Sequence, residues 1–137
     1  MLSNLSLGKA GELRVASELL IRGYEVFQTV VDSGVDLILA NGKRIQVKSA
    51  RRSKAYANYT KYTFSFKAWH NKQGNYTPHE LTGIDFVILW AVDDNEFFVI
   101  PATKIRGKYS VILTCHGKRQ WSLYLPYRAQ WNLLEES

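Results

Sequence analysis

Three residues of types that support metal-assisted chemistry lie within a short stretch of this sequence. Asp36 offers a carboxylate, Gln46 an amide oxygen and Lys48 an ammonium group. A carboxylate can bind a divalent metal that activates water, and a cation can balance charge that builds on phosphoryl oxygens. Mg²⁺ needs only one or two carboxylates besides water and phosphate oxygens. These residue types therefore fit phosphodiester hydrolysis, and the backbone carbonyl of Val47 could serve as a further metal ligand.

A β-hairpin is expected to bring these side chains together. Asn41-Gly42 is the strongest short signal for a hairpin turn, and strand-forming runs lie on both sides of it. Side chains alternate along a strand, so Gln46 and Lys48 share one face, and the hairpin register places Asp36 on the neighbouring strand. The strands are expected over residues 35–40 and 44–49, with Val35, Leu37, Ile45 and Val47 facing the core.

An amphipathic helix is expected before the hairpin, over residues 6–21. Its apolar positions recur at three- and four-residue spacing, at Leu13, Ala16, Leu19 and Leu20. Ser6 is the expected N-cap, and Gly23 directly after Arg22 is a typical end signal.

The remaining segments predict a mixture of strands, loops and one terminal helix. A strand over residues 24–30 forms an antiparallel meander with the hairpin, and residues 62–66 add to the same sheet. The apolar runs 86–92 and 97–100 predict a hairpin at the sheet centre. Loops are expected over 50–60 and 70–83, a helical turn over 102–105, short strands over 111–113 and 122–125, and a helix over 126–134.

Length and composition predict one α/β domain over residues 1–137, with a mixed central β-sheet flanked by helices. The single cysteine, Cys115, excludes an intramolecular disulfide and a cysteine-rich zinc site, as expected for a reducing compartment. No export signal and no membrane-spanning apolar run is present, so we expect a soluble cytoplasmic protein without membrane contact. His70, His79 and His116 lack metal-ligand spacing.

A net charge of +6 favours a polyanionic partner. Basic residues cluster around the proposed site, although a run of charge is often only a solvated surface. We expect these residues to contact DNA phosphates: Lys43, Arg44, Arg51, Arg52 and Lys54. Tryptophans 69, 121 and 131 are expected in the core or an interface.

The order of these residues resembles the PD-(D/E)XK nuclease superfamily over about residues 8–49. The resemblance rests on Gly8, Gly11-Glu12, Gly23-Tyr24, Gly34-Val35-Asp36 and Ile45-Gln46-Val47-Lys48-Ser49, most like archaeal Holliday-junction resolvases and the group I intron homing endonuclease of this superfamily. It implies a restriction-endonuclease-like core in which Asp36 and Lys48 take the positions of the superfamily's Asp and Lys. It also implies that Glu12 is the helix glutamate and that Mg²⁺ is the cofactor, with Mn²⁺ as a substitute.

The sequence departs from the superfamily pattern at Gln46, where an acidic residue is commoner. A neutral amide can still donate an oxygen to a metal, but it lowers the charge of the site. Some members, including that homing endonuclease and Mrr-like restriction enzymes, have Gln-x-Lys. The expected catalytic set is therefore Asp36, Gln46, Lys48 and Glu12, with Asp36, Gln46, Val47 and Glu12 as metal ligands.

The leading interpretation is a metal-dependent DNA endonuclease, sequence-specific and of homing or restriction type. A structure-specific Holliday-junction resolvase is the first alternative, and the second is a catalytically inactive DNA-binding module on the nuclease fold. An RNA-processing nuclease also stays open. Because one domain carries one cleavage centre, cutting both strands implies a homodimer or a higher homo-oligomer.

Overall fold

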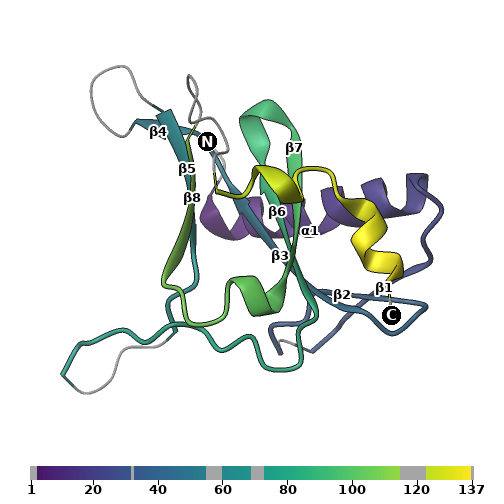
Figure 1. Ribbon diagram of the computed structural model, residues 1–137, viewed down its shortest axis with the longest axis horizontal. Helices are drawn as coiled ribbons and strands as arrows, with labels where there is room; N and C mark the ends of the chain where they lie inside the picture. Colours follow the sequence, from purple (N-terminus) through teal and green to yellow (C-terminus); the bar gives the residue numbers. More distant parts are fainter. Residues whose placement is uncertain (1–2, 32, 55–59, 69–72, 115–122, 137) are drawn as a thin grey trace.

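The computed structural model describes residues 3–31, 33–54, 60–68, 73–114 and 123–136. Its main element is a five-stranded sheet in the order β1-β2-β3-β6-β7 (Figure 1). The strands are β1 (Val26–Gln28), β2 (Leu37–Leu39), β3 (Arg44–Ala50), β6 (Phe86–Ala91) and β7 (Glu96–Pro101). Strands β3 and β6 run parallel and the other neighbours antiparallel, so the expected mixed sheet is confirmed.

A second, three-stranded antiparallel sheet contains β4 (Ser53–Lys54), β5 (Thr60–Ser65) and β8 (Ser110–Thr114). The expectation that residues 62–66 extend the main sheet is therefore wrong. Strand β3 is already paired on both sides, by β2 and β6, and cannot accept a third neighbour. Strand β5 instead covers a face of the main sheet with its alternating aromatic side chains, Tyr62, Phe64 and Phe66.

The main sheet separates two hydrophobic cores, because the side chains of its inner strands alternate between the two faces. Phe86 and Ile88 of β6 pack with the α-helix α1 (Asn4–Ile21), in one core. Val87 and Leu89 pack with the second sheet, in the other core. Both faces of β6 are buried, which explains its continuous apolar run. The hairpin β6–β7 exists as expected, but β3 is the central strand and β7 ends the sheet.

Helix α1 begins earlier than expected, with Ser3 as the N-cap in place of Ser6. The Ser3 hydroxyl accepts a hydrogen bond from the backbone N–H of Ser6 at 3.1 Å. The buried positions of the helix are Gly11, Val15, Ala16 and Leu19, whereas Leu13 and Leu20 are half-exposed. Gly23, at φ +93°, follows the end of the helix as expected.

The end of the chain contains two short 3₁₀ segments where a helix over residues 126–134 is expected. These are η4 (Leu125–Tyr127) and η5 (Trp131–Glu135). Between them Arg128 is extended and bridges to Phe98 of β7, and Ala129 has a positive φ, so a continuous helix cannot form. The expected strand over 122–125 is not formed in its described part, residues 123–125. Trp131 is buried in the helix-side core.

The other short elements lie close to where they are expected. The helical turn is η2 (Ala102–Lys104), and η1 (Val92–Asp94) joins β6 to β7. The segment 50–60, expected as a loop, contains β4 and the start of β5. None of the helices in the described ranges is long and apolar enough to cross a membrane. Cys115, His70, His116, Trp69 and Trp121 lie outside the described residues.

Candidate active site

The β2–β3 hairpin holds the Asp36 carboxylate against β3. Strand β2 pairs with β3 in the register Leu37 to Ile45, and Gly42 adopts the positive φ that the turn requires. Asp36 immediately precedes β2, and its backbone N–H donates to the carbonyl of Ile45 at 2.9 Å. Its Oδ2 accepts a hydrogen bond from the backbone N–H of Val47 at 2.7 Å. The carboxylate is therefore anchored beside the middle of β3.

Gln46 and Lys48 lie on one face of β3, opposite Ile45 and Val47, as strand alternation predicts. The Gln46 side chain is 7% exposed, and its Oε1 has no hydrogen-bond partner among the described residues. Lys48 Nζ lies 5.5 Å from the centre of the Phe66 ring, over its face. A buried acceptor without a partner is costly, so Gln46 Oε1 has the properties of a ligand atom for a cation.

Glu12 of α1 reaches the same site. Its carboxyl group lies within hydrogen-bonding contact of the Asp36 carboxyl group, and Lys9 Nζ lies 3.8 Å from Glu12 Oε2. A cleft of about 490 Å³ is lined by Glu12, Asp36, Gln46, Val47 and Lys48, together with the first turns of α1. The structure thus brings together all the residues that the sequence predicts for catalysis and metal binding.

The electrostatics of this cleft favour the protonated form of Asp36 when no cation is present. Burial, and after it contact with Glu12, raise the pKa of Asp36 to about 7, against the opposing effects of the Val47 N–H and Lys48. Burial also lowers the pKa of Lys48, and Asp36 partly compensates for that effect. Carboxyl groups of this kind bind cations in competition with protons.

The donor set fits a divalent cation with a small number of protein ligands. No group of three or more His, Cys, Asp or Glu side chains that could hold a metal occurs within the described part of the chain. Asp36 and Glu12 would therefore be the charged ligands, and the orphaned Gln46 Oε1 would add a neutral oxygen. Hard oxygen donors with few carboxylates are the environment that Mg²⁺ accepts.

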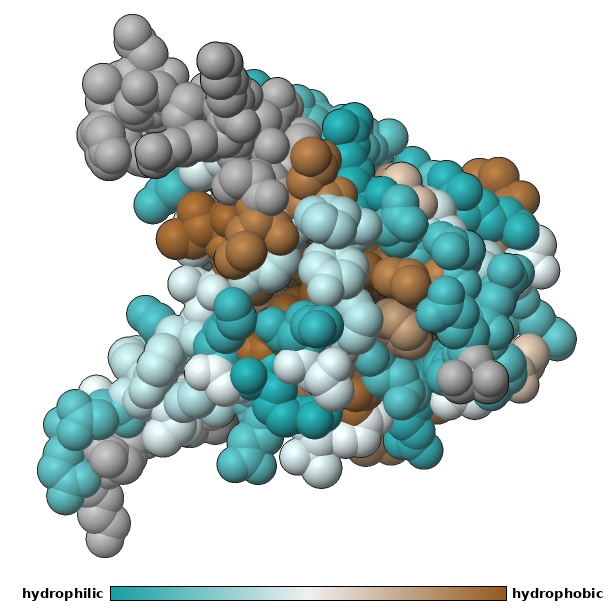
Figure 2. Space-filling model, viewed as in Figure 1, coloured by the Kyte–Doolittle hydropathy of each residue, from teal (hydrophilic) through white to brown (hydrophobic). Residues whose placement is uncertain are grey.

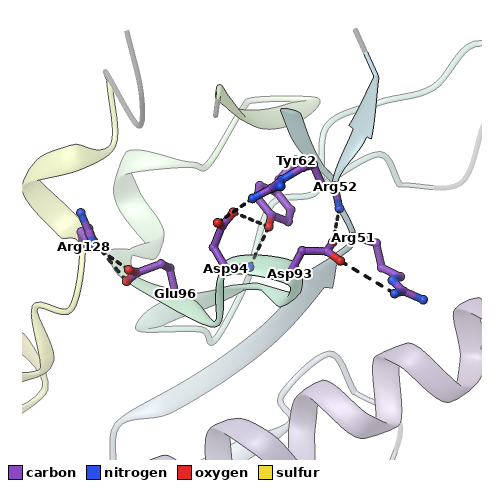
Figure 3. Close-up of polar contacts among 7 residues, drawn as sticks. All are labelled: Arg51, Arg52, Tyr62, Asp93, Asp94, Glu96 and Arg128. Carbon is purple, nitrogen blue, oxygen red and sulfur yellow. Dashed lines mark hydrogen bonds and ion pairs between the residues drawn. The ribbon is translucent and has the colours of Figure 1, made fainter. Parts of the chain in front are cut away.

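Four of the five basic residues expected to contact DNA lie at the two ends of β3 and the fifth lies on β4, and none lines the cleft that contains Asp36. Lys43 and Arg44 lie at the end of β3 next to the Asn41-Gly42 turn. At the other end Arg51 and Arg52 point toward the acidic turn η1, as Figure 3 shows. Arg52 forms an ion pair of 2.6 Å with Asp94, and Arg51 an ion pair of 3.8 Å with Asp93. Lys54 is exposed on β4.

The acidic turn η1 also contacts the second sheet. Tyr62 of β5 donates its hydroxyl proton to Asp94 Oδ2 at 2.6 Å, and the Asp94 backbone N–H donates to the same hydroxyl at 3.0 Å (Figure 3). The Asp93 Oδ2 atom accepts a hydrogen bond from the Arg52 backbone N–H. The turn therefore joins the end of β3 to the second sheet, an arrangement that no local sequence pattern indicates.

Near the site, Lys9 was not singled out from the sequence, and Gly11 was noted only as part of the motif. Lys9 forms the ion pair with Glu12 noted above, and its i, i+3 spacing from Glu12 is a signal that could have identified it. Gly11 packs against Ser49 of β3 so closely that an added Cβ would lie 1.7 Å from the Ser49 Oγ atom. Gly11 belongs to the quoted motif, but only the packing explains why it is glycine.

Comparisons with known proteins agree with this fold. Residues 3–134 match the family described as PD-(D/E)XK endonuclease. Among solved structures, the chain resembles that of a bacterial homing endonuclease, I-Ssp6803I, with a TM-score of 0.77 and 22% identity, over 93% of this chain and 90% of that one. No curated protein matches the sequence. The family match spans nearly the whole chain, and the chain therefore belongs to the PD-(D/E)XK endonuclease family.

Proposed function

We propose that this protein is a Mg²⁺-dependent endonuclease that hydrolyses phosphodiester bonds in DNA. The observation that carries the proposal is the buried, unpartnered Oε1 atom of Gln46, a residue that lines the same cleft as Asp36, Glu12 and Lys48. A purely structural buried amide would have its hydrogen bonds satisfied. Membership of the endonuclease family supports the same activity.

Each residue of the cleft has a separate role in this proposal. The carboxylates of Asp36 and Glu12, the Gln46 Oε1 atom and the Val47 carbonyl would hold Mg²⁺, for which Mn²⁺ is a chemically similar substitute. When bound, the cation polarises the phosphate and lowers the pKa of an attacking water. Lys48 would position that water. Burial lowers the pKa of Lys48 and so favours the neutral amine, which can accept the proton of the water, and the ammonium group formed in this way would stabilise the negative charge of the transition state.

The proposal also specifies which form of DNA is cut. We favour sequence-specific cleavage of duplex DNA, of homing or restriction type, because the sequence has two long segments, residues 50–60 and 70–83, whose side chains could reach into a groove. The similar solved structure is that of a homing endonuclease, which is consistent with this choice. Because the described part of one chain provides one cleft with the proposed catalytic residues, double-strand cleavage would use a homodimer or a higher homo-oligomer.

The test is a cleavage panel of linear duplex DNA, a four-way junction, single-stranded DNA and RNA, with Mg²⁺, Mn²⁺ or EDTA. We expect metal-dependent cleavage of duplex DNA. Asp36→Ala should abolish cleavage, and Lys48→Ala should reduce the rate by about 10²- to 10³-fold, as for comparable electrostatic groups. Thermal unfolding should show that both variants remain folded.

Matched controls separate these effects from general damage. Glu25→Ala removes an exposed carboxylate after α1, and Lys104→Ala removes an exposed lysine from η2, and both should leave cleavage unchanged. Cleavage of the junction alone would establish the resolvase alternative. DNA binding without cleavage under either metal would establish the inactive DNA-binding module and contradict the proposal.

A further inference from the structure

The solvent-facing side of the second sheet carries a regular set of polar residues. Along β5 the side chains of Tyr62 and Phe64 are buried, and the alternate positions point away from the core. Strand β8 pairs with β5 in the register Thr63 to Ile112 and Ser65 to Ser110, so its alternate residues share that side. We call this surface the outer face, formed by Lys61, Thr63, Ser65 and Lys67 with Ser110, Ile112 and Thr114.

The outer face carries the kinds of chemical group that can contact the edges of base pairs in a groove of DNA. None of the residues of β4, β5 and β8 is acidic, so the face has a net positive charge. The hydroxyls of Thr63 and Ser65 are exposed and can donate or accept hydrogen bonds. Ile112 is 45% exposed between them, at a position where an apolar side chain can contact a thymine methyl group.

The shape of this side of the molecule also suits a groove. Strand β4 pairs only with Thr60 and Lys61, so from Tyr62 to Ser65 strand β5 forms a two-stranded antiparallel ribbon with β8. Such a ribbon fits the major groove of B-DNA, which is about 12 Å wide. In Figure 1 the second sheet is seen edge-on, and the chain after β5 projects from its lower end as an arm. In this arm Lys67 and Pro78 form an isolated antiparallel bridge. Figure 2 shows the outline of the molecule hollowed above this arm.

The outer face is continuous with the proposed active site. Ser53 and Thr63 line a second cleft, of about 390 Å³, together with Arg51 and Arg52. Asn4, at the start of α1, lines both this cleft and the catalytic cleft. A DNA duplex whose phosphate enters the catalytic cleft would therefore pass directly along the second sheet.

We propose that the outer face reads base pairs in the major groove of duplex DNA, beside the phosphodiester that is cut. This inference rests on the proposed function and adds the surface that selects the sequence. The hydroxyls of Thr63 and Ser65 contact base edges, Ile112 contacts methyl groups, and Lys61 and Lys67 contact the flanking phosphates or guanine edges.

Two variants of Thr63 with opposite charges test the contact between the outer face and DNA under conditions that prevent cleavage. Binding of a fluorescein-labelled duplex pool of mixed sequence is measured by anisotropy in EDTA. Thr63→Glu should weaken binding by about tenfold or more, because a carboxylate would enter a negatively charged groove. Thr63→Lys should bind as tightly as the unaltered protein or more tightly. A structural defect would lower the affinity of both variants.

The matched control is Ser17→Glu, at an exposed position of α1, which should change the affinity by less than about twofold. Thermal unfolding checks that each variant is folded. Equal affinity of Thr63→Glu and the unaltered protein would overturn the inference while leaving the proposed cleavage intact. Failure of the unaltered protein to bind the duplex pool would overturn it as well.

Base selection provides a second, independent readout. A randomised duplex pool is cleaved with Mg²⁺, and the cut ends are sequenced for the unaltered protein, Ile112→Ala and Ser65→Ala. Each variant should change the base frequencies at positions beside the cut, and the Ile112 variant should lose a preference for thymine. Unchanged frequencies in both variants contradict base reading by this face. Absence of any cleavage by the unaltered protein contradicts the proposed function instead, and the anisotropy result still decides whether the face contacts DNA.

Discussion

At the scale of single residues, the Asp36 carboxyl group makes the stability of the fold depend on pH and on metal binding. Its pKa is raised from 3.8 to about 7, first by burial and then by Glu12. A group with a raised folded-state pKa stabilises the fold fully below its unfolded pKa and loses that contribution as the pH rises through the folded value. In the metal-free protein, this contribution therefore declines between about pH 4 and pH 7.

Asp36→Asn should remove the loss of stability that Asp36 causes as the pH rises, because asparagine keeps an acceptor for the Val47 N–H and carries no charge. After discounting for partial exposure, its free energy of unfolding relative to the unaltered protein should rise by about 1–3 kcal/mol from pH 4 to pH 8. Urea unfolding in EDTA at several pH values measures this difference. A difference that does not vary with pH would contradict the assignment. Mg²⁺ should stabilise the unaltered protein more than the variant.

Gln46→Glu tests the neutral ligand at the same scale. A third carboxylate beside Asp36 and Glu12 would add charge to the donor set, so the Mg²⁺ concentration for half-maximal cleavage should fall by about tenfold. Without metal, the added charge should lower the melting temperature. Gln46→Met, of similar size but without an oxygen, is the control and should require more Mg²⁺. An equal metal requirement in all three proteins would remove Gln46 from the metal site.

At the scale of elements, the contact of α1 with β3 decides whether Glu12 reaches Asp36. Gly11 allows the close approach, because an added Cβ would lie 1.7 Å from the Ser49 Oγ atom and 3.0 Å from its Cβ. Gly11→Ala should therefore destabilise the fold by about 1–3 kcal/mol, despite the better helix propensity of alanine. It should also reduce cleavage, because the helix must move away from the sheet.

The control for Gly11 lies one turn earlier on the same helix. Gly8 has nothing within 4 Å of an added Cβ, so Gly8→Ala should leave the free energy of unfolding unchanged or raise it slightly. Ser49→Ala in the Gly11→Ala background should restore part of the lost stability, because it removes the closest atom. Urea unfolding measures all of these variants. Equal stability of Gly11→Ala and Gly8→Ala would show that the helix contact is looser than the geometry indicates.

At the scale of the whole molecule, the two faces of the main sheet pack against different layers. One face packs on α1, and the other packs on the second sheet through residues such as Phe64 and Leu89. Gln46 and Lys48 of β3, the proposed catalytic residues, lie on the face toward the second sheet, yet α1 reaches them from its first turns. The site therefore depends on all three layers, and the net charge of +6 is consistent with a DNA substrate on this assembly.

The sequence by itself determined the β2–β3 hairpin and the residues that share its catalytic face. Turn chemistry at Asn41-Gly42 and the two-residue period of a strand act over short distances, so they place Asp36 beside Gln46 and Lys48 without knowledge of the rest of the chain. The mixed sheet and the endonuclease family follow from the same local order of residues.

Only the tertiary structure decided the features that depend on distant segments. Strand β5 forms a separate sheet because both edges of β3 are already occupied. The alternation of apolar and polar residues in β5 would be the same in either sheet, so the sequence pattern does not distinguish the two. Glu12 meets Asp36 only because Gly11 lets α1 approach β3. Arg52 pairs with Asp94 across more than forty residues of sequence, by a contact between exposed side chains that no periodicity encodes. Each of these outcomes depends on which surfaces remain available after the hairpin has formed.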